Sequence, residues 1–230
     1  MSGADVTPAA RRSIRVWDLP VRMFHWTLVP LLLAMWWTGE QRDIETHSRL
    51  GVVLVGLLVF RLLWGLFGSE TARFAHFLRG PRAVVAYLAG RMPHHVGHNP
   101  LGGWSVALIL LLLVAQATCG LFAHDVDGME SGPLSHLVSY DTADLARAWH
   151  HRLFNAILAM AALHILAICW YLVARGEDLL MPMVTGRKPV PEGVAAPRLG
   201  GPLALGIAVA AAAGLAWWVG SGAPLPDMGV

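Results

Sequence analysis

The chain contains 230 residues, of which 56% are hydrophobic and 14% are charged, and its mean hydropathy is +0.54. Soluble domains carry roughly 25% charged residues, so this composition excludes an ordinary water-soluble globular protein. A formal net charge of +2 offers no strongly basic surface, and we expect no nucleic acid among the partners.

Five apolar runs follow a polar lead that occupies residues 1–20. Each run is close to the length of about 20 residues that a helix needs to cross a bilayer. The runs lack the alternation of barrel strands, and an open sheet would leave backbone groups unsatisfied in lipid. We therefore predict an all-α integral membrane protein whose spans are 21–38, 47–67, 104–122, 146–173 and 203–219.

The segments between these runs complete the predicted domain organisation. Residues 71–88 are basic and semi-amphipathic, which is typical of a segment lying along the membrane interface. Residues 181–202 contain several prolines and predict an irregular linker. We expect a four-helix transmembrane bundle over 21–180, a Pro-rich cytoplasmic linker over 181–202, and an appended fifth transmembrane helix with a short outer tail over 203–230.

The distribution of charge predicts the orientation. Basic residues lie before span one, between spans two and three, and after span four, whereas acidic residues gather between spans three and four. Cytoplasmic loops carry the excess of Lys and Arg, so the N-terminus is predicted to be cytoplasmic and the C-terminus periplasmic. The basic residues are Arg11, Arg12, Arg15, Arg22, Arg73, Arg79, Arg82, Arg91, Arg187, Lys188 and Arg198, and the acidic ones are Asp125, Asp127, Glu130, Asp141 and Asp144.

Eleven histidines are unexpected in so hydrophobic a chain. An ionisable group inside a bilayer is costly, and a histidine there is a functional candidate by default. Span four carries His150 and His164, fourteen residues apart, which is close to four helical turns. Both rings therefore leave one face of the helix, roughly 21 Å apart along its axis.

Two other histidines match these in depth. Span one runs outward with His25 near its start, and span two runs inward with His47 at its outer edge. His25 therefore lies at the depth of His164, and His47 at the depth of His150. Imidazole is a common axial ligand of haem iron, so these depths predict two bis-His haem sites. The sequence has no C-x-x-C-H, which excludes covalent attachment of the c type.

Each histidine also has an ordinary interpretation. One intramembrane His often serves as a hydrogen-bond donor between helices, and His47 could be an interfacial residue. Glycines 51, 56, 65 and 120 either let a flat macrocycle approach the backbone or serve close helix packing.

Two more polar residues are candidates for cofactor binding. Arg61, near the inner end of span two, is expected to snorkel or to bind a haem propionate. His98, just before Asn99 and Pro100, is a candidate for a quinone or a propionate, and a solvated imidazole in a turn is the alternative.

Several short motifs follow one another along the chain in a fixed order. They are residues 16–22 before His25 and Trp26, residues 38–40, His47 with Gly51, Arg61 with Trp64 and Gly65, residues 72–74, residues 97–100 with Gly102, Thr118 with Gly120 and Leu121, His150 with Asn155 and His164, and residues 183–188. Together they resemble the bacterial di-haem cytochrome b561 family, which is related to the b-type cytochrome subunits of nickel–iron hydrogenases and formate dehydrogenases. The likeness covers residues 14–190.

The resemblance implies two non-covalent haem b groups in a four-helix core, with His25, His47, His150 and His164 as axial ligands. It also implies a place in a respiratory chain of the bacterial inner membrane. There the protein would pass electrons between the quinone pool and an extracytoplasmic redox protein such as a c-type cytochrome or a hydrogenase or dehydrogenase subunit. The fifth span departs from the family core, and either docks a partner subunit or anchors the tail.

Two alternatives belong to other functional classes. One is a membrane-anchor cytochrome b subunit of a hydrogenase- or dehydrogenase-type complex, and the enzyme class stays open between a quinone oxidoreductase and a subunit of one. The other is a haem-free transporter that uses intramembrane histidines. Transporters often have broken helices and repeated halves, and neither is evident in this sequence.

Overall fold

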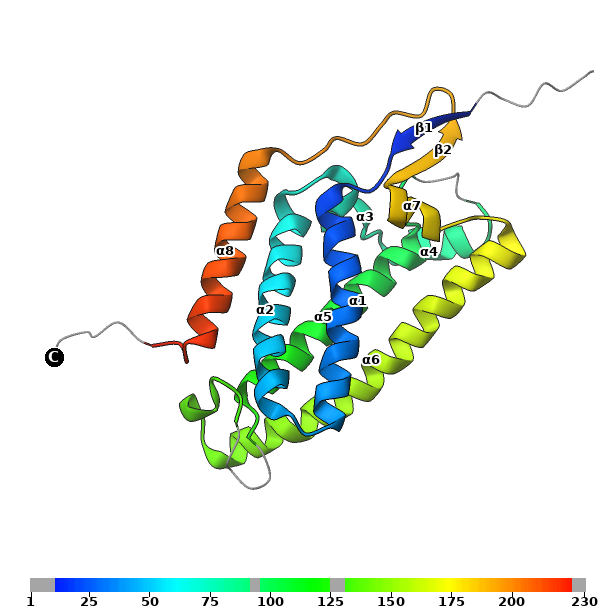
Figure 1. Cartoon of the computed structure of the whole chain (residues 1–230). Coiled ribbons are helices and arrows are strands. Elements are labelled where there is room, and N and C mark those ends of the chain that lie inside the picture. Colours follow the sequence, from blue (N-terminus) through cyan, green and yellow to red (C-terminus); the bar gives the residue numbers. More distant parts are fainter. Residues whose placement is uncertain (1–10, 92–95, 125–130, 225–230) are drawn as a thin grey trace, which may run out of the picture.

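The computed structural model describes residues 11–91, 96–124 and 131–224 (Figure 1). Five of its helices are long and apolar enough to cross a membrane, and they correspond to the five predicted spans. The prediction of an all-α integral membrane protein is confirmed. The five are α1 (Leu19–Glu40), α2 (Ile44–Phe67), α5 (Pro100–Phe122), α6 (Tyr140–Arg175) and α8 (Pro202–Gly220).

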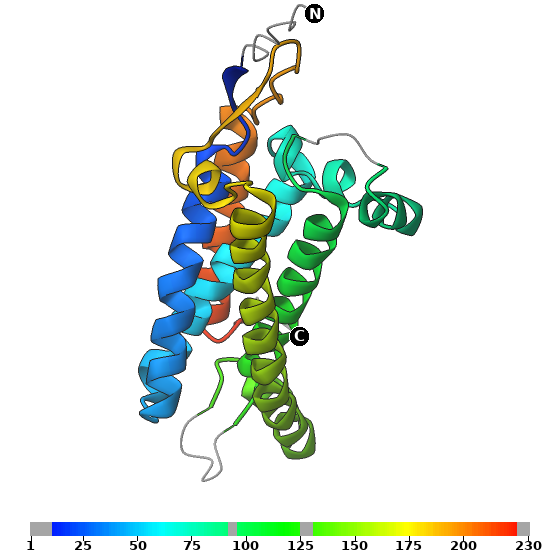
Figure 2. The ribbon, with the colours of Figure 1, turned by 90° about the vertical axis from the view of Figure 1, so that its right-hand side faces the viewer.

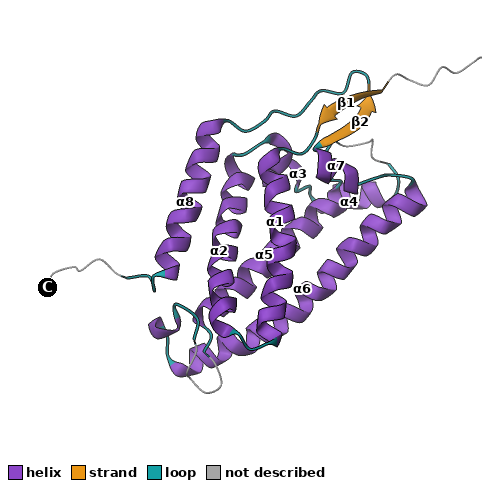
Figure 3. Ribbon diagram, in the orientation of Figure 1, coloured by secondary structure: helices purple, strands orange, loops and turns teal. Residues whose placement is uncertain are grey.

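Most of the shorter elements gather at one end of the bundle, which we call the sheet end (Figure 3). The opposite end, where α1 leads into α2 and α5 leads towards α6, is called the loop end. The shorter elements are β1 (Arg11–Arg15), η1 (Glu70–Ala72), α3 (Phe74–Phe77), α4 (Pro81–Leu88), η2 (Ser135–Leu137), α7 (Leu180–Thr185) and β2 (Arg187–Pro191). Of these, η2 belongs to the loop end. Residues 1–10 and 225–230 of the predicted lead and tail, and Asp125, Asp127 and Glu130, lie outside the described residues.

Strands β1 and β2 form a two-stranded antiparallel sheet, with Arg11 opposite Pro191 and Arg15 opposite Arg187. The prediction of an irregular linker over 181–202 is therefore wrong in its first half, which contains α7 and β2. Extended backbone suits the prolines of β2, because proline lacks the N–H that a helix interior needs. The two strands join the N-terminal lead to the linker.

Side-chain caps and prolines fix where the long helices begin. The Asp18 carboxylate accepts a hydrogen bond from the backbone N–H of Val21 at 2.8 Å, and the Asn99 side chain accepts one from Gly102 at 2.7 Å. Both α1 and α5 carry a proline in the first helical turn, where its missing N–H costs nothing. Helix α6 ends at Gly176, whose φ of +61° is the left-handed conformation that glycine adopts without strain.

Helices α1, α2, α5 and α6 form the bundle, and α8 lies beside α2 (Figures 1 and 2). The contact between α2 and α8 uses small residues, as is common in membranes. A Cβ placed on Gly56 would lie 3.2 Å from the Cβ of Ala216 and 3.6 Å from the carbonyl oxygen of Ala212. Gly56 therefore serves close helix packing.

The apolar core of the bundle is a cluster of leucines and one phenylalanine shared by α1, α2 and α5. Many other apolar side chains face outward, which suits contact with lipid. Ile157 of α6 packs against the core cluster and so identifies the face of α6 that is turned inward. The cluster consists of Phe24, Leu28, Leu31, Leu54, Leu58, Leu110 and Leu113.

Candidate functional site: two histidine pairs in the bundle

The inward face of α6 carries a stripe of residues with a spacing of seven. His150, Ile157, His164 and Tyr171 follow one another at this interval, and seven residues are close to two helical turns. Because Ile157 packs against the core, the two histidines of the stripe also face the bundle. One helix thus presents one imidazole towards each end of the interior.

At the loop end, His47 of α2 faces His150 of α6. Their ring centroids lie 6.0 Å apart, with an interplanar angle of 80°. The Nδ1 atom of His47 lies 2.8 Å from the carbonyl oxygen of Met35, and that of His150 lies 3.0 Å from the carbonyl oxygen of Gln116. A carbonyl only accepts, so both Nδ1 atoms carry the proton and each Nε2 has the lone pair that a metal ligand needs. In this structure the lone pair of His150 accepts from the side-chain amide of Gln116 at 3.1 Å, a contact that a bound metal would replace.

At the sheet end, His25 of α1 faces His164 of α6, with ring centroids 6.5 Å apart and an interplanar angle of 53°. Nδ1 of His25 is buried and has no hydrogen-bond partner among the residues that the structure describes. Trp26 packs edge-on against the His25 ring, with a centroid distance of 4.9 Å. The structure thus brings together both pairs of histidines that the depth argument matched.

Both pairs fit an iron held by two axial imidazoles. A metal–imidazole bond is about 2.0 Å long, so two rings that share one metal ion have centroids roughly 6 Å apart. The observed 6.0 and 6.5 Å agree with this spacing. At the loop end, a Cβ on Gly120 would lie 2.9 Å from Cε1 of His150, so only glycine leaves room for the ring in this position. The residues present therefore fit two bis-His haems, and the ligand assignment itself stays a prediction.

Arg61 is buried, with 3% of its surface exposed, and the expectation that it snorkels to the interface is wrong. Its guanidinium donates to the carbonyl oxygen of Ala72 at 3.3 Å and lies over the ring of Phe74, 5.2 Å from the centroid. A buried cation needs compensation, and the carboxylate of Asp18 interacts electrostatically with this guanidinium.

His98 packs between two aromatic rings, with centroids 4.5 Å from Trp17 and 4.7 Å from Phe77. The alternative of a solvated imidazole in a turn is therefore wrong. Burial lowers the pKa of His98 to about 3, with smaller contributions from Arg61 and His164. His98 is thus a neutral imidazole, and its Nδ1 is buried with no hydrogen-bond partner among the described residues.

A pocket of about 260 Å³, which we call the sheet-end pocket, opens beside His98. Its walls combine residues that precede α5, residues that follow α2, and part of the linker before α8. The lining residues are Glu70, Thr71, His76, Phe77, Arg79, Val96, His98, Pro100, Ala195, Ala196 and Pro197. The pocket is therefore adjacent to a neutral imidazole that lies near the sheet-end pair.

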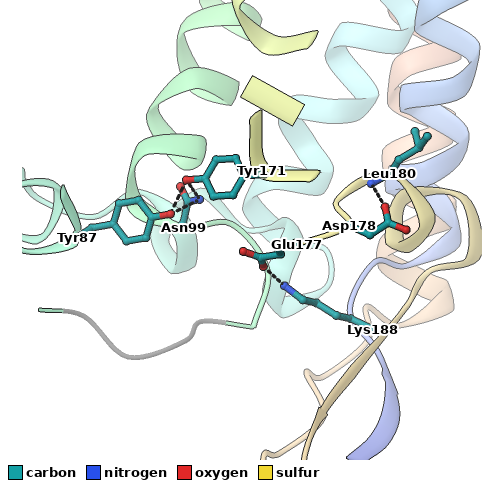
Figure 4. Close-up of polar contacts among 7 residues, drawn as sticks. All are labelled: Tyr87, Asn99, Tyr171, Glu177, Asp178, Leu180 and Lys188. Carbon is teal, nitrogen blue, oxygen red and sulfur yellow. Dashed lines mark hydrogen bonds and ion pairs between the residues drawn. The ribbon is translucent and has the colours of Figure 1, made fainter. Parts of the chain in front are cut away.

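Two tyrosines form a cluster with Asn99, the residue that follows His98 in the chain (Figure 4). The hydroxyls of Tyr87 and Tyr171 are 2.5 Å apart, and Nδ2 of Asn99 donates to each of them at 3.0 Å. Because Oδ1 of Asn99 caps α5, one side chain joins α4, α5 and α6. Burial and the contact with Tyr171 raise the pKa of Tyr87, so this hydroxyl stays protonated.

Sequence reasoning missed Gln116 and the tyrosine cluster. Gln116 lies in the apolar run of α5 and is buried, with 8% of its surface exposed. A glutamine in a predicted span is itself a signal, since polar side chains there mark function. Tyr87 and Tyr171 gave no such signal, because their contact joins residues far apart in the chain.

The family model described as prokaryotic cytochrome b561 matches residues 16–186 of the chain. The match contains all four paired histidines, and it ends before β2 and α8. No curated protein and no solved structure matches the chain.

Proposed function

Because the chain belongs to the prokaryotic cytochrome b561 family, a family of haem b electron-transfer proteins of the membrane, we propose that it carries two haems. We propose further that it passes electrons between the quinone pool and an extracytoplasmic redox protein. The observation that carries the proposal is the presence of two facing histidine pairs, spaced at 6.0 and 6.5 Å, towards opposite ends of one face of α6. Membership in a cytochrome family argues against a haem-free transporter.

In this proposal His25 and His164 hold one haem b, and His47 and His150 hold the other. Bound haem iron supplies one-electron exchange at each site. The chain contributes the tautomer, because the carbonyl oxygens of Met35 and Gln116 accept from Nδ1 of the loop-end histidines and so leave Nε2 as the metal-binding nitrogen.

We assign the sheet end to the cytoplasm of a bacterial inner membrane and the loop end to the periplasm. The argument is the positive-inside rule, because Arg11, Arg12, Arg15, Arg187 and Lys188 all belong to the two strands. An extracytoplasmic partner, such as a c-type cytochrome or a hydrogenase or dehydrogenase subunit, would then meet the His47–His150 end.

We place quinone exchange in the sheet-end pocket. A quinone carbonyl needs a hydrogen-bond donor, and His98, which lines this pocket, carries one N–H as a neutral imidazole. Arg61 is assigned to a haem propionate at the sheet-end pair, since a buried guanidinium stabilises a carboxylate strongly. The protein would act as a quinone oxidoreductase, alone or as a subunit of one.

The haem content of the purified, detergent-solubilised protein tests the two-haem proposal, and a pyridine haemochrome assay measures it. We expect two haems b per chain in the unmodified protein, and one in each of the variants His164→Ala and His150→Ala. His136→Ala is the matched control, because His136 is exposed in η2 and belongs to neither pair. A His164→Ala variant that keeps two haems, or an unmodified chain that binds fewer, would overturn the proposal.

A further inference from the structure

Part of the sheet-end pocket is built from residues that lie outside the family match. Ala195, Ala196 and Pro197 line it, whereas the match ends at residue 186. These three belong to a stretch between β2 and α8, residues 194–200, which we call the strap. The pocket of this protein is therefore completed by its C-terminal extension.

The strap is fastened to the turn after α2. The backbone N–H of Glu70 donates to the carbonyl oxygen of Arg198 at 2.9 Å, and the N–H of Arg198 donates back to the Glu70 carboxylate at 3.0 Å. The N–H of Gly200 donates to the hydroxyl of Ser69 at 2.8 Å. Three hydrogen bonds thus hold the strap against residues 69–70, and Glu70 also lines the pocket.

Close packing and an arginine fix the strap further. A Cβ on Gly200 would lie 2.5 Å from Cη2 of Trp64, which is almost fully buried, so the strap lies directly on this indole. At the other end, the guanidinium of Arg12 donates to the carbonyl oxygen of Val194 at 2.6 Å. On either side the strap continues into a docked element, since β2 pairs with β1 and α8 packs on α2.

The size and lining of the pocket limit what it can hold. About 260 Å³ is below the roughly 300–1,000 Å³ of typical small-molecule sites, which suits a single flat ring with its tail outside. The alanine side chains of the strap leave this space open, and a larger side chain at the same position would fill it. The strap lines the same pocket as His98, so it limits which rings reach this imidazole.

We propose that the strap is a specificity element of the quinone site, and that α8 and the β1–β2 sheet hold it over the ring of a bound quinone. This inference rests on the proposed quinone function. It gives the extension beyond the family core a role in substrate selection.

The variant Ala196→Trp tests the proposal, and Leu199→Trp is its control on the same strap, since Leu199 is exposed and does not line the pocket. Two quantities are measured on detergent-solubilised holoprotein. One is the affinity for a redox-inactive quinone analogue by calorimetry, and the other is the rate of haem reduction by a short-tailed quinol. Haem content and reduction by dithionite show that each variant is intact.

We expect Ala196→Trp to weaken analogue binding and slow reduction by quinol about tenfold, which corresponds to about 1.4 kcal/mol, because the indole takes up space that the quinone ring needs. Leu199→Trp should stay within about twofold of the unmodified protein, as surface substitutions do. If Ala196→Trp and the unmodified protein bind the analogue equally, the role of the strap is refuted and the quinone site is not. An unmodified protein that neither binds the analogue nor accepts electrons from quinol would refute the quinone site as well.

A second variant tests the hydrogen bonds that hold the strap against residues 69–70. Ser69→Ala combined with Glu70→Ala removes two of the three hydrogen bonds between the strap and residues 69–70. We expect the ratio of reduction rates for a one-ring and a two-ring quinol to move towards one, while haem content stays unchanged. A ratio equal to that of the unmodified protein would count against the proposal.

Discussion

Both ring nitrogens of His150 contact Gln116, with Nδ1 3.0 Å from the backbone carbonyl oxygen and Nε2 3.1 Å from the side-chain amide nitrogen. The first contact determines the tautomer and comes from the main chain. The orientation of the ring therefore depends on the backbone of α5, and the neighbouring Gly120 leaves space for it.

The first prediction concerns this loop-end site. Gly120→Val should reduce the haem content by one haem per chain, because its Cβ would start 2.9 Å from the His150 ring. Gln116→Leu should keep both haems, since the backbone carbonyl is retained. A haemochrome assay measures both, and Gly214→Val is the control, because a Cβ at Gly214 meets nothing within 4 Å. Full haem content in Gly120→Val would contradict the packing argument.

The second prediction concerns Asn99. Asn99→Ala removes the cap of α5 and leaves the hydroxyls of Tyr87 and Tyr171 without a shared donor. Loss of a cap and of buried hydrogen bonds should cost about 1–3 kcal/mol. Thermal unfolding in detergent measures the loss, with Tyr140→Phe as the control because the Tyr140 side chain is exposed. An unchanged melting temperature would show that the cluster adds no stability.

The third prediction concerns α8. Gly56→Leu should separate α8 from α2, because a Cβ at Gly56 lies 3.2 Å from Ala216. Haem content should be unchanged, since the histidine pairs belong to α1, α2 and α6. A cysteine pair at Val52 and Gly220, which meet across this interface, measures the separation through the yield of the disulfide. Gly206→Leu is the control, and a full disulfide yield in Gly56→Leu would refute the prediction.

The fourth prediction concerns pH. The backbone N–H of Arg198 lowers the pKa of the Glu70 carboxyl below 4.5. The hydrogen bond that favours the charged form therefore contributes fully above pH 4.5 and is lost as the pH falls through the lowered value. Hydrogen exchange of the strap amides should show protection factors at pH 6 that decrease as the pH falls below 4.5. If the protection of the strap amides in the unmodified protein does not change as the pH is lowered, the Glu70 carboxylate does not stabilise the strap.

The parts of this protein that the sequence predicts are those set by local periodicity. The spans follow from apolar runs, and the pairing of the histidines follows from a spacing of fourteen between His150 and His164 together with the direction of each helix. Arg61 shows the limit of prediction from local sequence, because an arginine in this position can either snorkel or be buried. The positions of Phe74 and Ala72 determine that it is buried.

What the sequence did not predict depends on contacts between distant segments. In the register of β1 with β2, Arg15 lies opposite Arg187, and no short-range sequence pattern predicts this pairing. The strap reaches Glu70 through backbone hydrogen bonds, which leave no mark in side-chain type. Such contacts require the whole bundle to be assembled before they exist.

Because α6 carries one histidine of each pair, it also determines when during translation each pair becomes complete. Helices α1 and α2 leave the ribosome first, each with a single member of a pair, His25 or His47. Under the proposed ligand assignment, a nascent chain that has not reached α6 has no complete iron site of either kind. The loop-end site is complete once His150 has been translated, the sheet-end site follows with His164, and β2 closes the sheet with β1 soon after. Cofactor loading is thereby deferred until the four-helix core is present, and a truncated product is left without a redox centre.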